Sequence, residues 1–204
     1  MKLVLASNNA KKLAELQALF APLGIELVTQ GALGIAEAEE PFDSFVENAL
    51  TKARHAARWS GLPALADDSG LSVEALNGAP GVLSARYATL FNQPKSDADN
   101  NRVLLEQMAD VSNLGDRSAR FVCALVAVKS AADPEPLIAM GRWQGQILPA
   151  LQGGGGFGYD PLLFIPALGK SVGQLSVAEK NTLSHRALAA ADLAVQMREV
   201  WHLG

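Results

Sequence analysis

The sequence predicts an α/β fold, a sheet covered by helices, in a single domain that spans residues 1–204. Short apolar runs that fit strands alternate with longer amphipathic segments that fit helices along the whole chain. The composition, 49% hydrophobic and 19% charged, is that of an ordinary globular protein, which excludes a disordered chain. A chain of this length buries a core of its own without the help of disulfides.

The first elements follow from periodicity and from capping residues. Residues 2–6 and 26–30 are predicted strands, and the amphipathic segment between them is a predicted helix. A second helix is predicted over residues 44–60. Ser44 and Glu47 have the spacing of a capping box there, and apolar side chains then recur at helical intervals.

Further strands and helices are predicted between residues 63 and 201. An apolar strand, residues 63–66, is expected to stop at Asp67 and Asp68, and the polar stretch 92–100 is expected to form a loop. Further strands are predicted over residues 121–128 and 136–141, around a turn, and further helices over residues 101–108 and 184–201.

Charge and apolar runs restrict the partners. Seventeen Lys and Arg against twenty-one Asp and Glu give a net charge of −4, so the basic surface that holds a polynucleotide is not expected, whereas a single nucleotide fits this balance. The apolar run of residues 3–6 is too short for an export signal, and no stretch approaches the roughly eighteen apolar residues of a membrane span. We therefore expect a cytoplasmic protein with no membrane partner, whose one cysteine, Cys123, packs as a small hydrophobe.

A candidate anion site lies between the first predicted strand and the first predicted helix. Exposed N–H groups and the positive end of a helix favour a negative ligand at such a junction, and two lysines add charge. Its residues are Ser7, Asn8, Asn9, Ala10, Lys11 and Lys12. The alternative is that Asn9 only caps the helix and that both lysines are solvated.

Neighbouring carboxylates indicate a metal site. Asp67 and Asp68 are placed at a strand end, where open α/β sheets hold their ligands. Because neighbouring residues in a strand point to opposite faces, one of the two is expected to face a given cleft. The acids Glu37, Glu39 and Glu40 of a preceding loop add oxygen ligands that suit Mg²⁺ bound together with phosphate. A solvated acidic loop is the alternative.

Two further basic positions have a ligand-binding interpretation. Lys52 would reach a phosphate from its predicted helix, unless it is an ordinary surface lysine. Ser184 is expected to cap a new helix, which would bring Lys180, His185 and Arg186 together at its positive end. Such a cluster suits an anion or a keto oxygen, and the alternative is an ordinary basic pair on one helix.

A glycine-rich segment, residues 153–161, precedes an apolar strand. Its glycines match the spacing G-x-G-x-x-G, but Asp160, Pro161 and the following strand exclude the helix that a dinucleotide-binding turn requires. We interpret the segment as a backbone that approaches a ligand closely, beside aromatic side chains on which a base would stack. A structural turn with Phe157 in the core is the alternative.

Six stretches follow one another along the chain, and together they are far more specific than any one alone. They are Ser7-Asn8-Asn9 with Lys12, Phe45-Val46-Glu47-Asn48-Ala49 with Lys52-Ala53, Ala66-Asp67-Asp68-Ser69-Gly70-Leu71, Gly78-Ala79-Pro80-Gly81 with Ser84-Ala85-Arg86-Tyr87, Gly156-Phe157-Gly158-Tyr159-Asp160-Pro161, and Ser184-His185-Arg186. In this order they resemble the inosine triphosphate pyrophosphatase family over nearly the whole chain. The resemblance implies a long mixed β-sheet flanked by helices, two lobes with a central cleft, and a homodimer. It also implies an enzyme that uses Mg²⁺ to hydrolyse ITP, dITP or XTP to the monophosphate and pyrophosphate.

The resemblance further implies a role for each candidate residue. Residues 7–12 would hold the triphosphate, and Lys52 would support its charge. Glu40 and Asp68 would place the metal, Asp68 would also act as general base on the attacking water, and Ser69 would touch the nucleotide. The base pocket would comprise Phe157, Gly158, Tyr159, Asp160, Lys180, His185 and Arg186.

Selectivity is expected from position six of the purine, where hypoxanthine and xanthine carry a keto oxygen and adenine carries an amino group. A donor from the backbone or from Arg186 would pair with the keto oxygen and reject the amino group.

Two other hypotheses use the same residues. One is a module that binds a nucleotide without turnover, and the other is a metal-dependent phosphatase that releases orthophosphate.

Overall fold

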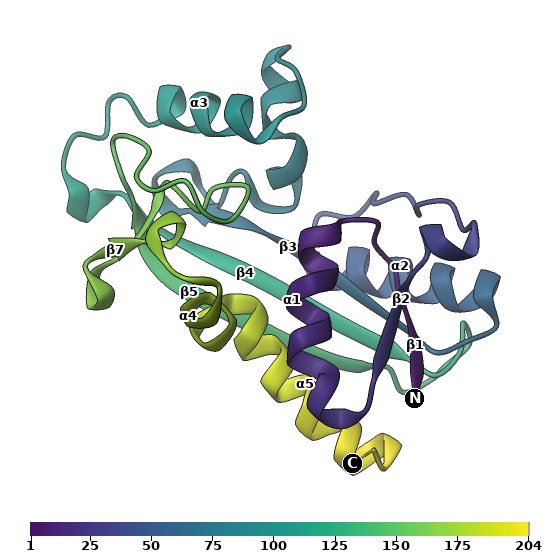
Figure 1. The fold of residues 1–204 in the computed structure, drawn as a ribbon. Coiled ribbons are helices and arrows are strands. Elements are labelled where there is room, and N and C mark those ends of the chain that lie inside the picture. The colour runs from purple at the N-terminus through teal and green to yellow at the C-terminus, as the bar shows by residue number, and fades with distance from the viewer. Residues whose placement is uncertain (204) are drawn as a thin grey trace. The chain divides into compact units, whose positions relative to one another are not determined.

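The computed structural model describes residues 1–203, which form a mixed sheet flanked by helices (Figure 1). Within these residues the sheet has seven strands in the order β2-β1-β3-β4-β5-β6-β7. The strands are β1 (Lys2–Leu5), β2 (Glu26–Thr29), β3 (Ala64–Val73), β4 (Ser118–Val128), β5 (Leu137–Ile147), β6 (Leu163–Ile165) and β7 (Lys170–Ser171). The α-helices are α1 (Ala10–Phe20), α2 (Phe45–Ser60), α3 (Asp97–Gln107), α4 (Val177–Leu183) and α5 (His185–Trp201). Because β1 pairs parallel with β2 and β3, whereas β6 pairs antiparallel with β5 and β7, the predicted mixed α/β sheet is confirmed.

Contacts along the chain define two compact units. Unit 1 comprises residues 1–68, 123–141 and 185 onward, and unit 2 comprises residues 69–122 and 142–184. The strands β3, β4 and β5 therefore each contribute residues to both units. Within residues 1–203, every helix is too short or too polar to cross a membrane.

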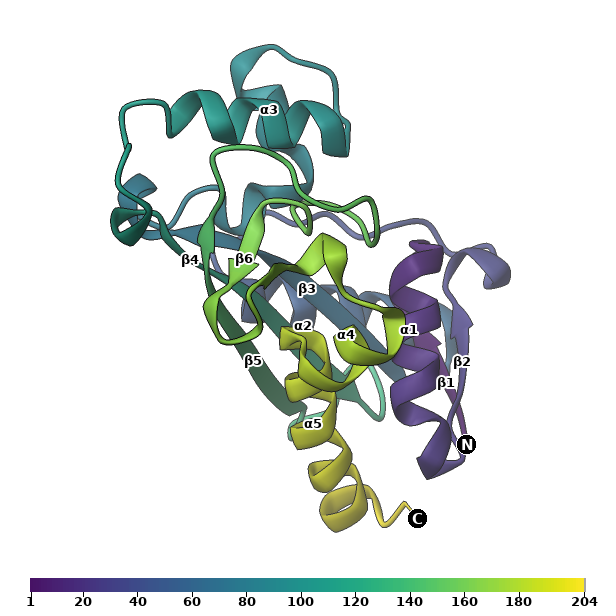
Figure 2. The same ribbon diagram turned by 60° about the vertical axis from the view of Figure 1, so that its left-hand side comes forward.

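In unit 1 helices cover both faces of the sheet. The helices α1 and α5 lie side by side on one face, and α2 lies on the other (Figures 1 and 2). Leu65 of β3 packs in the core beneath α1 and α5, whereas its neighbour Ala66 packs in the core beneath α2. This alternation is the period of two along a strand. It assigns the next residues, Asp67 and Asp68, to the α1–α5 face and the α2 face respectively.

Short polar side chains set the helix ends. Asn9 caps α1 and Ser96 caps α3, each accepting backbone N–H groups of the first turn. A capping box of Ser176 and Glu179 starts α4. That helix ends at Leu183, Ser184 follows it with extended backbone, and α5 begins at His185, so the predicted break is confirmed.

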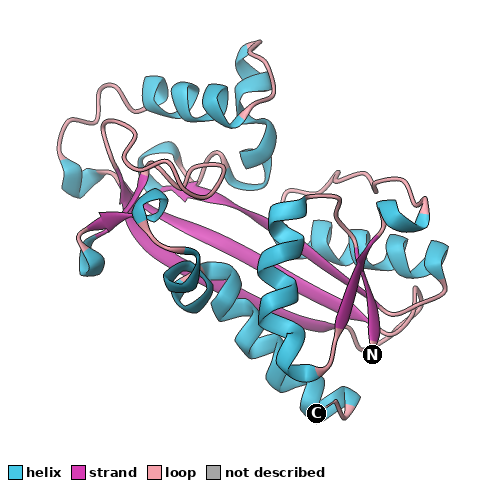
Figure 3. Cartoon of the chain, viewed as in Figure 1, coloured by secondary structure: helices cyan, strands magenta, loops and turns pink. Residues whose placement is uncertain are grey.

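Unit 2 has a core of its own. Buried Leu71 of β3, Phe121 of β4 and Ile147 of β5 belong to one apolar cluster with Leu104 of α3. A long segment without helix or strand, residues 148–162, joins β5 to β6 and carries the glycine-rich segment (Figure 3). The chain after this segment is a strand and not a helix, as predicted.

The prediction for the third strand was wrong in its length. β3 runs to Val73, so Asp67 and Asp68 lie within the strand and not at its end. The strand continues because Leu71 and Val73 are buried in unit 2, and because charged partners accompany both acids.

The prediction for the third helix was wrong in its start. Residues 97–100 were expected to belong to a loop, but α3 begins at Asp97 because the Ser96 side chain accepts the N–H of Asp99. Acids in the first turn also suit the positive end of a helix. The other predicted strands and helices lie close to their predicted positions, with β4 and β5 longer at one end, whereas β7 and α4 had no predicted range.

Close packing of β5 against α5 within unit 1 leads to a first prediction. A Cβ at Gly141 would come 1.8 Å from the backbone oxygen of His185, the first residue of α5. Gly141→Ala is therefore expected to lower the free energy of unfolding by about 3 kcal/mol, the cost of overpacking against backbone. Urea denaturation measures this loss. Gly115→Ala is the control, since a Cβ there makes only ordinary contact at 3.6 Å, and equal losses in both variants would contradict the packing argument.

Candidate active site

The turn between β1 and α1 uses its asparagines to organise the backbone. Asn9 Oδ1 accepts the N–H groups of Lys11 and Lys12 at 3.0 and 3.1 Å. The amide of Asn8 accepts the N–H of Gly31 at 2.9 Å and donates to Glu37 at 3.2 Å. The two amides thus cap α1 and tie the turn to the loop that follows β2, and the lysines are the cationic side chains that the turn offers to an anion.

Two lysines converge where β1 stops. The carbonyls of Pro63 and Leu65 accept the N–H groups of Val4 and Ala6, and the next carbonyl of this series, that of Asp67, lies beyond the end of β1. Lys52 Nζ donates to that oxygen at 3.0 Å, and Lys12 Nζ lies 3.5 Å from it. Lysines from helices on opposite faces of the sheet therefore bring two ammonium groups to one strand end.

Asp67 is a buried centre of charge on the α1–α5 face. Its Oδ1 accepts from Lys12 Nζ at 2.6 Å and its Oδ2 accepts from Arg186 Nε at 2.6 Å, with the Cys123 thiol at 3.5 Å. Arg186, itself 1% exposed, also pairs with Glu15. Burial alone would raise the pKa of Asp67, but the charges of Arg186 and Lys12 outweigh burial and hold this pKa well below its ordinary value. The carboxylate is therefore ionised in the core.

Asp68 is the corresponding charge on the α2 face. Lys52 Nζ bridges Asp68 Oδ1 at 2.7 Å and Glu40 Oε1 at 2.6 Å. Burial raises the pKa of Asp68 against the opposing charge of Lys52. Burial would lower the pKa of Lys52, but the two carboxylates outweigh it and raise that pKa. Asp68 Oδ2 is buried and has no hydrogen-bond partner among residues 1–203.

The donor set of Glu40 and Asp68 fits Mg²⁺ bound together with a phosphate. Within residues 1–203, no three His, Cys, Asp or Glu side chains gather as a metal site, so the protein alone supplies at most two carboxylates. Mg²⁺ typically binds through one or two carboxylates and completes its shell with water and substrate phosphate. A cation, the Lys52 ammonium, already lies between these two carboxylates, and the unpartnered Asp68 Oδ2 provides a further oxygen.

Unit 2 holds a second cluster, on the glycine-rich segment. Asp160 Oδ2 accepts the N–H of Phe157 at 2.9 Å and pairs with Lys180 Nζ at 2.7 Å. The same ammonium lies 4.4 Å from the centre of the half-buried Phe157 ring, a cation–π contact. Tyr159 donates its hydroxyl to the carbonyl of Ser84 at 2.9 Å, and burial raises the pKa of Tyr159. The segment is therefore ordered by side chains around one aromatic ring.

The predicted site residues fall into these two groups. Unit 1 gathers the candidates for phosphate and metal, and unit 2 gathers the aromatic candidates. Unit 1 contains Ser7 to Lys12, Glu40, Lys52, Asp68, His185 and Arg186, and unit 2 contains Ser69, Phe157 to Asp160 and Lys180. Arg186 and His185 are both buried at the start of α5.

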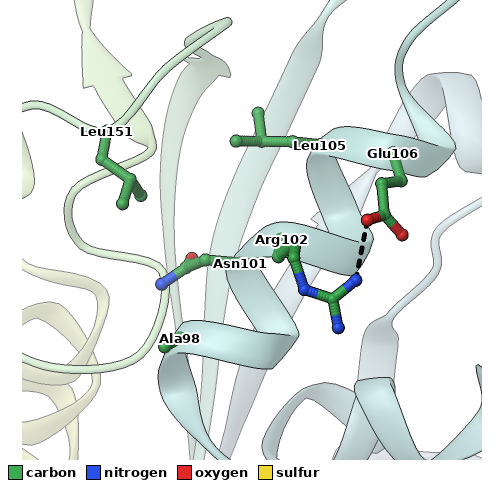
Figure 4. A pocket seen from close by; sticks show the side chains of 6 residues that line it. All are labelled: Ala98, Asn101, Arg102, Leu105, Glu106 and Leu151. Carbon is green, nitrogen blue, oxygen red and sulfur yellow. Dashed lines mark hydrogen bonds and ion pairs between the residues drawn. The ribbon is translucent and has the colours of Figure 1, made fainter. Parts of the chain in front are cut away.

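A cavity of about 410 Å³ in unit 2 includes none of these residues. It lies along α3 and is lined by Ala98, Asn101, Arg102, Leu105, Glu106 and Leu151 (Figure 4). Its lining is largely apolar and its charged side chains, Arg102 and Glu106, pair with each other at 2.7 Å. The charged clusters, and not this cavity, are therefore the candidate site.

Comparison with known proteins places this geometry in a family. Residues 3–196 match the sequence profile of the Ham1 family. A relative from Leptothrix cholodnii named dITP/XTP pyrophosphatase is 61% identical over the whole of both chains. Another of that name, from Methylibium petroleiphilum, is 60% identical over 98% of this chain and 99% of its own.

The chain belongs to the Ham1 family. A solved structure of a HAM1 protein from Coxiella burnetii superposes with a TM-score of 0.89 at 43% identity and covers 98% of this chain and 100% of its own. A nucleoside-triphosphatase / dITP/XTP pyrophosphatase from Mycobacterium abscessus superposes with a TM-score of 0.73 at 40% identity, over 96% and 98% of the two chains. The sequence-based assignment to the inosine triphosphate pyrophosphatase family and the predicted fold class are thereby confirmed.

Some residues of the candidate site in this Ham1 family member were not singled out by the sequence analysis. Glu15 pairs with Arg186, and Asp97 and Asn101 contact the glycine-rich segment. Asp67 was a candidate only as one of two neighbouring carboxylates, and the family resemblance gave the role to Asp68. The one signal available was the spacing of Asp97 and Asn101, four residues apart on one face of a helix. The pairing of Glu15 with Arg186 joins residues 171 positions apart and has no local signal.

The buried charges lead to a second prediction. Asp67→Asn removes the carboxylate that balances buried Arg186 and Lys12, so it is expected to lower the free energy of unfolding by about 3–5 kcal/mol. Chemical denaturation followed by circular dichroism measures the loss. Asp192→Asn, at an exposed position of α5, is the matched control and is expected to change stability by less than about 1 kcal/mol. A loss at Asp67 as small as that of the control would contradict the account of the charge cluster.

Proposed function

We propose that this protein hydrolyses non-standard purine nucleoside triphosphates, ITP, dITP and XTP, to the nucleoside monophosphate and pyrophosphate, and so removes them from the nucleotide pool. The family membership and the names of the relatives support the reaction class. The observation that carries the proposal is the strand-end cluster of unit 1, where two ammonium groups that pair with three carboxylates meet at the carbonyl of Asp67. Transfer of a phosphoryl or nucleotidyl group to water depends mainly on positioning and charge neutralisation, which this cluster provides.

Lys12 and Lys52 are proposed to bind the triphosphate, together with the turn of residues 7–12. In the absence of an anion each lysine is neutralised by an aspartate. A triphosphate carries more negative charge than these carboxylates supply, so the ammonium groups can turn toward it without leaving the cluster. The N-terminal end of α1 adds a favourable dipole.

Asp68 is proposed to act as the general base. Its Oδ1 is held by Lys52, and its Oδ2 has no partner among residues 1–203 and can accept the proton of a water. Burial raises its pKa, which makes it a better proton acceptor than an exposed aspartate. The oxygen of that water bonds to the α-phosphorus, and the bond from this phosphorus to the oxygen that bridges the α- and β-phosphates breaks. Pyrophosphate leaves with that oxygen, and the nucleoside monophosphate remains.

Glu40 and Asp68 are the residues that would hold Mg²⁺. The ion would neutralise phosphate charge and lower the pKa of a bound water when it is present. Lys52 positions both carboxylates for this role, since it contacts each of them. Dependence on Mg²⁺, a homodimer and a location in the cytoplasm remain parts of the proposal.

The base is proposed to bind at the aromatic ring of Phe157 and at the neighbouring polar groups. Lys180 and Asp160 order this ring, and Gly158 and Tyr159 belong to the same segment. The family resemblance adds His185 and Arg186 of unit 1 to the proposed set. A donor opposite the keto oxygen at position six would favour hypoxanthine and xanthine and leave the amino group of adenine unpaired.

A nucleotide-binding module would use the same groups without hydrolysis, and a phosphatase would release orthophosphate instead of pyrophosphate.

Replacement of Asp68 tests the proposed base. Asp68→Asn keeps the shape of the side chain but cannot accept the proton, so kcat for ITP is expected to fall at least about 100-fold. Release of pyrophosphate from ITP, with circular dichroism to verify folding, measures this. Asp110→Asn, at an exposed position beyond α3, is the control. Unchanged turnover in Asp68→Asn would remove Asp68 from the mechanism, and orthophosphate as the product would replace the proposed reaction.

Replacement of Glu40 tests the proposed metal site. Chelation is expected to abolish turnover, and Mg²⁺ to restore it. Glu40→Gln is expected to raise the Mg²⁺ concentration for half-maximal activity about tenfold, because one of two carboxylate ligands is lost. It should also shrink the rise in Tm that Mg²⁺ with inorganic tripolyphosphate produces. Glu39→Gln, at an exposed neighbour, is the matched control, and equal effects of the two variants would contradict the assignment.

A further inference from the structure

The helix α3 holds one residue of the glycine-rich segment of unit 2, Gly158, by two hydrogen bonds. Gly158 donates its N–H to Asp97 Oδ2 at 2.8 Å and accepts at its carbonyl from Asn101 Nδ2 at 2.9 Å. Asp97 and Asn101 lie four residues apart on α3 and so share one face. Both polar groups of one residue of the segment are thus fixed by consecutive turns of a single helix.

The clamp adds to other contacts of the segment, such as the hydrogen bond from the Gly155 N–H to the carbonyl of Gly173 at 3.0 Å. Four consecutive glycines, residues 153–156, offer no side chains and a large conformational freedom. Gly156 and Gly158 have φ of +78° and +60°, in the left-handed region that favours glycine. Contacts from a rigid neighbour are therefore needed to select one conformation of the turn that carries Phe157.

The helix that makes the clamp is itself well anchored. Val103 and Leu104 of α3 are fully buried in the core of unit 2. Asn100, 2% exposed, accepts the N–H of Ala88 at 2.8 Å. Asn101 is 6% exposed, and its side chain extends from α3 toward the segment that carries Leu151 (Figure 4). The position of α3 is thus set independently of the segment that it holds.

We propose that Asp97 and Asn101 are positioning residues for base recognition: they fix Gly158, and through it the neighbouring ring of Phe157. The inference rests on the proposed function, since it takes Phe157 as the surface for the base. Both residues and the segment that they hold belong to unit 2, whereas the charged cluster belongs to unit 1. Their loss therefore weakens the binding of a nucleotide without weakening the binding of a ligand that has no base.

The experiment compares two ligands in three variants. Asp97→Ala and Asn101→Ala are each expected to raise KM for ITP about 3- to 10-fold, the effect of one lost hydrogen bond, with kcat within about twofold of the parent. The inhibition constant of inorganic tripolyphosphate, which carries no base, is expected to stay unchanged. Glu106→Ala is the matched control, because it removes an ion pair with Arg102 on the same helix and does not contact the segment (Figure 4).

Two further measurements keep the test decisive. Asp97→Asn retains an oxygen that can accept the N–H of Gly158, so it is expected to keep KM for ITP near the parent value even if Asp97→Ala fails to fold. Hydrogen exchange at the Gly158 amide is expected to accelerate in Asp97→Ala and not in Glu106→Ala, and this readout does not depend on activity. A parent protein that does not hydrolyse ITP would overturn the proposed function while the exchange still tests the clamp. An unchanged KM, unchanged exchange, or an equal rise in the tripolyphosphate inhibition constant would overturn the inference.

Discussion

The candidate active site depends on the alternation of side chains along β3. Because neighbouring residues of a strand point to opposite faces, the adjacent carboxylates of Asp67 and Asp68 are separated by the sheet, and each meets a lysine from a different helix. Through these two aspartates, a single strand contacts side chains of α1, α2 and α5 at the point where β1 ends. Two aspartates on one face would repel each other and leave one of them without a cation.

Asp67 and Asp68 are suited to different roles because their partners differ. Asp67 is enclosed by Arg186 and Lys12 and is ionised in the core, which suits a structural charge that joins α1 to α5. Asp68 keeps one buried oxygen without a partner and has a raised pKa. The first arrangement stabilises a fixed geometry, and the second leaves an atom available for a proton. Buried charges of the first kind stabilise a fold only as complete pairs, which explains why the cluster is so closely interlinked.

Much of this arrangement could be predicted from local sequence. Caps such as Asn9 and Ser44 fix helix ends within a few residues, so the starts of α1 and α2 followed from residue type. The strand period also predicted that Asp67 and Asp68 would face opposite ways. The length of β3 did not follow, because Ser69 and Gly70 after two acids are typical of a turn, and burial in unit 2 overrides that preference. Partners far apart in the chain had no local signal, as with Arg186 and Asp67 at a separation of 119 residues.

The central claim is that Lys12 and Lys52 form one anion site at the end of β1, and equilibrium binding of inorganic tripolyphosphate tests it most directly. Calorimetric titration of Lys12→Gln and Lys52→Gln is expected to show at least about tenfold weaker binding for each, with a smaller difference at high salt, where charge is screened. Lys95→Gln, at an exposed position of unit 2, should bind as the parent does. Parent-like affinity in both Lys12→Gln and Lys52→Gln would show that the triphosphate binds elsewhere and would contradict the account.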